Sequence, residues 1–159
     1  TGDLAKIGEL GEVRLIGRVK DNFKTAKGKF VSPVPLEQAL LKHPLVDAAM
    51  IIADGRSFVS ALLFAEGDAF QRAFTAYQNA PECADSQDAD YCIMQSLQKH
   101  VDQINATVND WEKIRSFRLI TEEPTVESGL LTPTMKLCRG KVSARHADLI
   151  ASMYSHKSE

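Results

Sequence analysis

Two apolar runs stand close together in this sequence, and they constrain the fold more than any other feature. The runs VDAAMIIAD (46–54) and FVSALLFAE (58–66) flank a tight turn formed by Asp54, Gly55 and Arg56. Continuous apolar strands are typical of buried sheets, and a Gly-containing turn between them predicts an antiparallel hairpin. We therefore expect this hairpin to form the core sheet.

The rest of the chain predicts further strands and helices around that sheet. EVRLIG (12–17) alternates polar and apolar residues and predicts a strand that pairs with a second strand at 23–26. Ser32 and Pro33 predict a helix start, and Pro44 is expected to end that helix one residue earlier. Periodicity predicts helices at 67–80 and 88–114, a strand at 114–121, an irregular loop at 122–136 and a terminal helix at 139–154.

The predicted fold class is therefore α+β, with an N-terminal β-hairpin plus a mostly antiparallel sheet packed with helices. A length of 159 residues fits one domain, and contents of 44% hydrophobic and 25% charged residues are ordinary for a globular protein. A net charge of −2 argues against a nucleic-acid binder. No apolar run reaches the roughly 18 residues that cross a bilayer. The first residues lack a basic-then-apolar pattern, so we expect no leader there. The chain begins with Thr1, so we expect an excised fragment.

The cysteines, histidines and aromatic residues predict no catalytic or metal site. Cys83, Cys92 and Cys138 are widely spaced and form no CxxC or Cys/His cluster, so we expect free thiols and a cytoplasmic protein. The four histidines lack a partner arrangement for nucleophilic catalysis or metal binding and are expected to be structural or surface residues. The larger aromatic residues are expected to pack helices rather than stack on bases, namely Trp111, Phe117 and Tyr154.

Four segments in order carry a resemblance to a known family. They are TGD (1–3), GRVKDNFKTAKGKFVSPVPLE (17–37), WEKIRSFRLI (111–120) and LTPTMKLCR (131–139). Together they resemble the C-terminal domain of long-chain fatty acid:CoA ligases, which are acyl-CoA synthetases of the AMP-binding, adenylate-forming superfamily. The resemblance implies that residues 1–17 comprise the end of the preceding domain, or linker region, and the first strand. Residues 18–159 are then the C-terminal lid domain, with a helical insert at about 66–110.

The family reaction has two steps, and the resemblance implies both for the full-length parent. A fatty acid and ATP, with Mg²⁺, give an acyl-adenylate and pyrophosphate, and CoA then gives acyl-CoA and AMP. The implied partner is the parent's own N-terminal adenylation domain, which supplies the phosphate loop and the fatty-acid pocket. This piece alone is expected to be inactive and to bind ATP, Mg²⁺ and CoA only weakly. The parent is expected to be cytoplasmic, and at most peripheral at the inner face of a membrane.

The resemblance assigns roles to three residues that act on the nucleotide and the acid. Asp3 resembles the aspartate that accepts hydrogen bonds from the ribose hydroxyls, and Arg18 resembles the arginine that contacts the nucleotide. Lys136 resembles the adenylation lysine, which binds carboxylate and phosphate oxygens in one conformation and is withdrawn in the other. On residue chemistry alone, a turn aspartate and solvated basic residues remain open for these positions.

Three further positions are assigned to motion and to CoA. Lys20 falls at the family's hinge, where the lid swings between the half-reactions. Lys27 and Gly28 fall at the pantetheine channel, although relatives often carry Gly, Gln or Glu beside that glycine. Glu37 matches a family glutamate for which helix capping or a local ion pair is as plausible as a chemical role.

The identity of the acyl acceptor stays open at this point. Met135 stands before Lys136 where many relatives have glycine, a form associated with long-chain enzymes. Asp3, Arg18 and Lys136 would equally serve another adenylating enzyme, of the carrier-protein-loading or luciferase-like kind. A non-catalytic binding module that has kept the fold is a further alternative.

Overall fold

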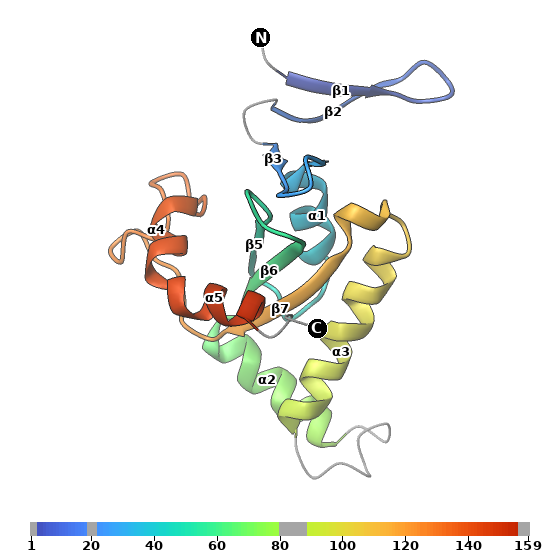
Figure 1. Cartoon of the computed structure of the whole chain (residues 1–159). Helices are drawn as coiled ribbons and strands as arrows, with labels where there is room; N and C mark the ends of the chain where they lie inside the picture. Colours follow the sequence, from blue (N-terminus) through green and yellow to red (C-terminus); the bar gives the residue numbers. More distant parts are fainter. Residues whose placement is uncertain (1–2, 19–21, 80–88, 156–159) are drawn as a thin grey trace.

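The computed structural model describes residues 3–18, 22–79 and 89–155 and shows an α+β fold, as expected (Figure 1). Its strands are β1 (Asp3–Ile7), β2 (Val13–Arg18), β3 (Phe23–Lys24), β4 (Phe30–Val31), β5 (Ala48–Ile52), β6 (Val59–Phe64) and β7 (Ile114–Ile120). Its helices are α1 (Pro33–Leu40), α2 (Gly67–Gln78), α3 (Ala89–Asn105), the short 3-10 helix at Asp110–Glu112, α4 (Arg139–Arg145) and α5 (Ala147–Ser155).

The central sheet has three strands in the order β5-β6-β7. Strands β5 and β6 form the predicted antiparallel hairpin, and Gly55 takes a φ of 65° in the turn between them. Strand β7 adds to the other side of β6 in parallel, so the sheet is mixed. Strand β5 therefore has one edge that no strand of this sheet occupies.

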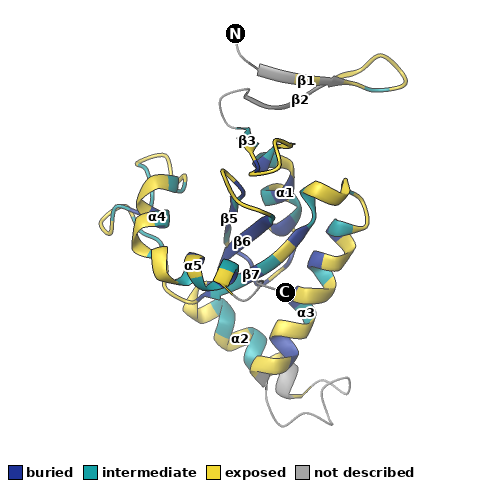
Figure 2. Ribbon diagram, viewed as in Figure 1, coloured by how far each residue is buried: buried dark blue, intermediate teal, exposed yellow. Residues whose placement is uncertain are grey.

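Helices cover both faces of this sheet, and alternate residues of one strand face opposite layers. Ala61 and Leu63 of β6 pack with α1 and α3, whereas Leu62 and Phe64 pack with α4, α5 and the loop after β7. All residues of β6 are buried as a result. Figure 2 shows the buried residues gathered on the central strands and on the inner sides of the helices.

The pairing predicted for the N-terminal strands is wrong. Strand β2 pairs antiparallel with β1, and β3 pairs with β4 in a separate short hairpin. The alternation in 12–17 identified a strand, but its partner precedes it, because the turn at 8–12 brings β1 back onto β2. Figure 1 shows the β1–β2 hairpin standing at one end of the molecule.

Three other predictions need correction. Helix α3 ends at Asn105 rather than at 114, because the Asn105 amide bonds both backbone groups of Ile114 and holds the chain in a turn. The terminal helix is two helices, α4 and α5, with a break at His146. Cys92 is disulfide-bonded rather than free, whereas Cys138 is free as expected. The polar stretch 81–88 lies outside the described residues.

Candidate functional site

The predicted loop after β7 carries Lys136 at the end of a closed turn. Leu130 is buried before the turn, and the chain returns through an antiparallel bridge between Leu131 and Leu137. The Cys138 amide then donates to the Leu130 carbonyl over 2.8 Å. The loop is therefore anchored at its base in the core layer that contains α4 and α5.

Three hydrogen bonds to Thr132 define the tip of this loop. The Thr132 amide donates to the Lys136 carbonyl over 2.7 Å, and the Met135 amide donates to the Thr132 carbonyl over 2.8 Å. The Lys136 amide donates to the Thr132 hydroxyl over 3.1 Å. Met135 takes a φ of 63°, the left-handed region that favours glycine. The backbone at Lys136 is thus fixed while its side chain is exposed.

Lys136 borders a groove of about 530 Å³ that runs between α1, the start of β5 and the loop. We name it the Lys136 groove, and its polar lining includes Glu37, Gln38 and Asp47. The side chains on its walls come from segments more than a hundred residues apart in the chain. A flexible ammonium on a fixed backbone can therefore reach ligands placed against this face.

Glu37 and Arg139 join α1 to the start of α4 beside this groove. Arg139 Nη2 lies 2.6 Å from Glu37 Oε1, which also accepts a hydrogen bond from the Ile51 amide over 3.0 Å. Arg139 Nη1 donates to the Ile51 carbonyl over 3.4 Å, and its guanidinium lies 5.4 Å from the centre of the Phe23 ring. Of the two structural roles left open for Glu37, the structure shows the ion pair.

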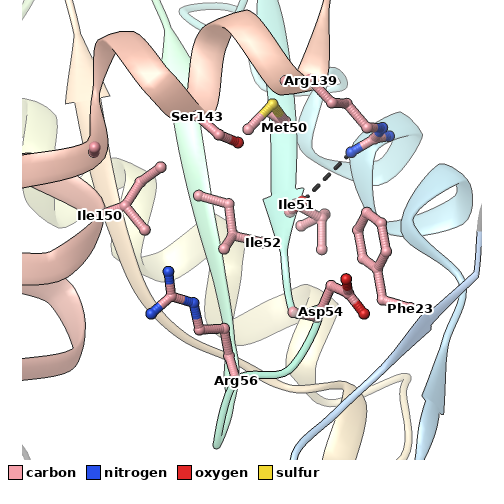
Figure 3. A pocket seen from close by; sticks show the side chains of 12 residues that line it. Phe23, Met50, Ile51, Ile52, Asp54, Arg56, Arg139, Ser143 and Ile150 are labelled. Carbon is pink, nitrogen blue, oxygen red and sulfur yellow. Dashed lines mark hydrogen bonds between the residues drawn. The ribbon is translucent and has the colours of Figure 1, made fainter.

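A smaller pocket of about 290 Å³ lies on the other side of Arg139, between β5 and the helices α4 and α5. Figure 3 shows Arg139 reaching the Ile51 carbonyl at its upper rim and Arg56 entering from the β5–β6 turn. Ile52 and Ile150 also line it. Its lining also includes Asp54 of the β5–β6 turn and Ser143 of α4.

A second candidate site surrounds the turn that contains Gly28. The Gly28 amide donates to the Thr25 carbonyl over 2.9 Å, and Gly28 takes a φ of 78°. Next to it lies an open pocket of about 560 Å³, which we name the basic pocket. It is lined by Thr25, Lys27, Lys29, Ser57, Phe58, Asp110, Trp111, Lys113 and Arg115.

Charges in the basic pocket are unevenly balanced. Asp110 lies 3.1 Å from Lys113 Nζ and 3.6 Å from Arg115 Nη2. The hydrogen bond from Lys113, with the charges of Lys113, Arg115 and Lys27, holds the pKa of Asp110 below its ordinary value. One carboxylate thus faces four cations, which suits an anionic ligand.

Trp111 corrects one prediction and adds to the site. It does not pack between helices; it is 43% exposed on the 3-10 helix, with Lys29 Nζ 5.1 Å from its ring centre. Phe117 is buried and Tyr154 is half-buried, as expected. Sequence reasoning missed the grouping of Lys29 with Lys113 and Arg115 because the first lies more than eighty positions before the other two. The WEK-x-R spacing, which puts basic residues beside an aromatic residue, was the one available signal.

The remaining predicted residues lie on or beside the N-terminal hairpin. Asp3 and Arg18 are direct cross-strand partners at the open end of β1 and β2. Their side chains, and all of Lys20, lie outside the described residues. Lys136 and Lys27 line separate pockets, so the structure does not bring the two assigned sites together. Among described residues, no three His, Cys, Asp or Glu side chains gather as metal ligands.

Within the ranges that the structure describes, none of the helices combines the length and the apolar character that crossing a bilayer requires.

Comparison with known proteins identifies the family. The family described as "AMP-binding enzyme C-terminal domain" matches this chain over residues 20–158. The chain is 34% identical over 160 residues to the long-chain-fatty-acid–CoA ligase FadD15 of Mycobacterium tuberculosis, covering 98% of this chain and 26% of the relative. It is 26% identical over 179 residues to the rat long-chain-fatty-acid–CoA ligase ACSBG1, covering 100% of this chain and 24% of that protein.

Solved structures agree with the assignment. The adenylation domain of a carboxylate reductase from Mycobacterium chelonae superposes with a TM-score of 0.70 at 29% identity, covering 98% of this chain and 23% of that one. The A-PCP didomain of a carboxylic acid reductase from Segniliparus rugosus, in complex with AMP, gives 0.68 at 26% identity, covering 98% and 20%. The chain spans about a quarter of the length of the curated relatives it matches. It belongs to the AMP-binding enzyme C-terminal domain family.

Proposed function

We propose that this chain is the mobile lid of an AMP-forming long-chain fatty acyl-CoA synthetase and supplies its adenylation lysine, Lys136. The observation that carries the proposal is the closed turn, which fixes the Lys136 backbone and leaves its ammonium exposed at a groove. Similarity to FadD15 and ACSBG1 along the whole chain supports the fatty acyl substrate.

In the adenylation step, a carboxylate oxygen of the fatty acid attacks the α-phosphorus of ATP and pyrophosphate leaves. Negative charge builds on the phosphoryl oxygens during this transfer, so a fixed cation aimed at them lowers the barrier. We assign that cation to Lys136. Asp3 and Arg18 hold the ribose and the nucleotide from the hairpin, and their cross-strand pairing supports a shared ligand.

Mg²⁺ is implied by the family, but the described residues do not offer it a ligand set. The ion would neutralise phosphate charge, and the steps assigned to this chain do not depend on it. Lys136 and the two nucleotide-binding residues of the hairpin, Asp3 and Arg18, bind oxygens of the substrates directly.

In the second step the CoA thiol attacks the acyl carbonyl, and AMP leaves. The basic pocket supports CoA binding, because its cations suit the phosphates of CoA and the exposed Trp111 ring suits an adenine face. Lys27 and Gly28 lie at the turn beside it, where we place the pantetheine arm. Because Lys136 and the basic pocket lie apart, we infer that the lid turns about Lys20 and presents each in turn to the parent's N-terminal domain.

A second candidate acceptor of the acyl group is a carrier protein, and one observation favours it. The adenylation domain of a carboxylate reductase and the A-PCP didomain of a carboxylic acid reductase superpose on this chain with TM-scores of 0.70 and 0.68 at 29% and 26% identity. In that case Lys136 keeps its role in adenylation and the acceptor of the acyl group changes. We propose the cytoplasm as the compartment in either case, on the family resemblance alone, because the disulfide of Cys92 removes the free-thiol argument for it.

The test replaces Lys136 with Ala in the full-length parent and measures two half-reactions separately. Adenylation is followed by fatty-acid-dependent pyrophosphate exchange, and thioester formation is followed from supplied acyl-adenylate and CoA. We expect Lys136→Ala to lower adenylation by about a hundredfold or more, the range for losing a transition-state donor, and to spare thioester formation. Lys141→Ala, an exposed lysine on α4, is the matched control. Unchanged adenylation in Lys136→Ala would overturn the proposal.

A further inference from the structure

The open edge of the central sheet is occupied by two side chains instead of a strand. Ile51 lies in the middle of β5, the outer strand of the sheet. Its amide donates to the Glu37 carboxylate, and its carbonyl accepts from the Arg139 guanidinium. The carboxylate and the guanidinium also bond each other. Together they satisfy both backbone groups of one edge residue, Ile51, as a neighbouring strand would.

This arrangement links the Lys136 loop to two other elements. Glu37 comes from α1, and Ile51 comes from the sheet. Arg139 is the first residue of α4 and lies three positions after Lys136. All three elements that border the Lys136 groove therefore meet in one cluster of hydrogen bonds.

The Glu37–Arg139 ion pair is less exposed to solvent than the other ion pair of α4. The side chains of Glu37 and Arg139 are 16% and 36% exposed, whereas those of Glu122 and Arg145 are 44% and 48% exposed. A charge-assisted bond that also satisfies backbone groups restrains geometry better than a solvated surface pair does. The two pairs hold opposite ends of α4, and only the Glu37–Arg139 pair lies at the Lys136 end.

We propose that Glu37 and Arg139 are positioning residues for Lys136, which rests on the function proposed above for that lysine. They hold the start of α4 against β5 and α1 and so set where the Lys136 ammonium lies relative to the transferring phosphoryl group. Neither touches the substrate in this role. Misplacement of a catalytic group by about 1 Å costs on the order of a hundredfold in rate.

The proposal predicts an effect confined to one half-reaction. Loss of the pair lets the first turn of α4 shift away from the sheet, and the Lys136 turn moves with it. Adenylation then slows because its charge-stabilising group is misplaced. Thioester formation does not use Lys136, so its rate is preserved. A general loss of folding would lower both half-reactions together.

The experiment compares Glu37→Gln with Glu122→Gln in the full-length parent. Both variants remove a carboxylate paired with an arginine of α4, but at opposite ends of the helix. We expect Glu37→Gln to lower kcat for adenylation tenfold to a hundredfold with KM for ATP little changed, and to leave thioester formation intact. Glu122→Gln should leave both half-reactions unchanged.

A second pair of variants keeps the test decisive if Glu37→Gln folds poorly. Arg139→Lys keeps the charge but loses the fork that reaches both Glu37 and Ile51, so adenylation should fall less than in Arg139→Ala. The same thioester assay verifies that each protein is folded.

The outcomes separate this inference from the function on which it rests. If Lys136→Ala abolishes adenylation but Glu37→Gln behaves like Glu122→Gln, the positioning role is wrong and the lysine assignment stands. Equal losses in both half-reactions for Glu37→Gln and Arg139→Lys would also overturn the positioning role. If Lys136→Ala adenylates normally, the proposed function itself fails.

Discussion

The hydroxyl of Tyr154, in the last helix, lies 2.7 Å from the hydroxyl of Ser60, a fully buried residue of the central strand β6. The same phenol oxygen lies 3.2 Å from the Ile52 carbonyl and 3.0 Å from the Phe58 carbonyl. The Tyr154 ring also stacks at a tilt on Phe58. One side chain thus ties the C-terminal helix to both strands of the central hairpin.

Tyr154→Phe should destabilise the chain by removing this shared hydroxyl. Ser60 then loses a hydrogen-bond partner in a buried setting, and we expect a loss of about 1–3 kcal/mol in the free energy of unfolding. Urea denaturation of the 159-residue chain measures it. Tyr91→Phe, on an exposed face of α3, should change stability by less than about 0.5 kcal/mol. Equal effects of the two variants would contradict the buried role of Tyr154.

His43 should make the fold sensitive to mild acid. The Leu45 amide donates to His43 Nδ1, and Nε2 lies 3.1 Å from the Ser96 hydroxyl, so the ring is bonded as a neutral imidazole. Burial, and then the neighbouring His100, lower the pKa of His43 below its ordinary value of 6.5. Protonation is therefore easier in the unfolded chain than in the folded one.

The sign of the pH effect follows from that lowered pKa. His43 contributes its full stability above pH 6.5, and the contribution is lost as the pH falls through the lower pKa of the folded state. We expect the urea midpoint of the wild type to fall between pH 7.5 and pH 5.5 by more than that of His43→Asn. If the urea midpoints of the two proteins fall equally over this pH range, His43 is not the cause of the acid sensitivity.

Met135 should tolerate glycine but not a β-branched residue. Its φ of 63° costs a non-glycine residue about 1–2 kcal/mol, and a branched Cβ raises that cost. In the full-length parent we expect Met135→Gly to keep adenylation within a fewfold of wild type. Met135→Val should lower it about tenfold, since about 1.4 kcal/mol corresponds to a factor of ten. Full activity in Met135→Val would show that the turn geometry is not needed.

Two charge changes in the basic pocket should move the affinity for CoA in opposite directions. Lys113→Ala removes one cation and should raise KM for CoA severalfold, whereas Asp110→Asn removes the opposing carboxylate and should lower it. Thioester formation from supplied acyl-adenylate provides the measurement. Both shifts should shrink at high salt, because exposed charges are screened. Shifts in the same direction would place the CoA phosphates elsewhere.

Sequence reasoning identified the elements that are specified locally. The 46–66 hairpin follows from two apolar runs and a Gly turn, and the start of α1 follows from Ser32 and Pro33. The Lys136 loop follows from its prolines and its lack of period. In each case neighbouring residues determine the backbone, so no distant contact had to be known.

Elements that depend on distant contacts were missed. The partner of β2 and the parallel addition of β7 are choices among strands far apart in sequence. The end of α3 depends on Asn105 reaching Ile114, although the apolar spacing continues to Val108. The Glu37–Arg139 pair joins residues 102 positions apart, so the sequence left its existence open.

Strand β6 contributes side chains to both helix layers, which bears on how helices could be exchanged between members of this family. Its odd-numbered side chains belong to the layer with α1 and α3, and its even-numbered ones, from Leu62 on, belong to the layer with α4 and α5. A chimera that imports helices from a relative needs to match the residues of β5, β6 and β7 that face them. Each layer of helices thus has its own face of the sheet to match, and β6 contributes side chains to both faces.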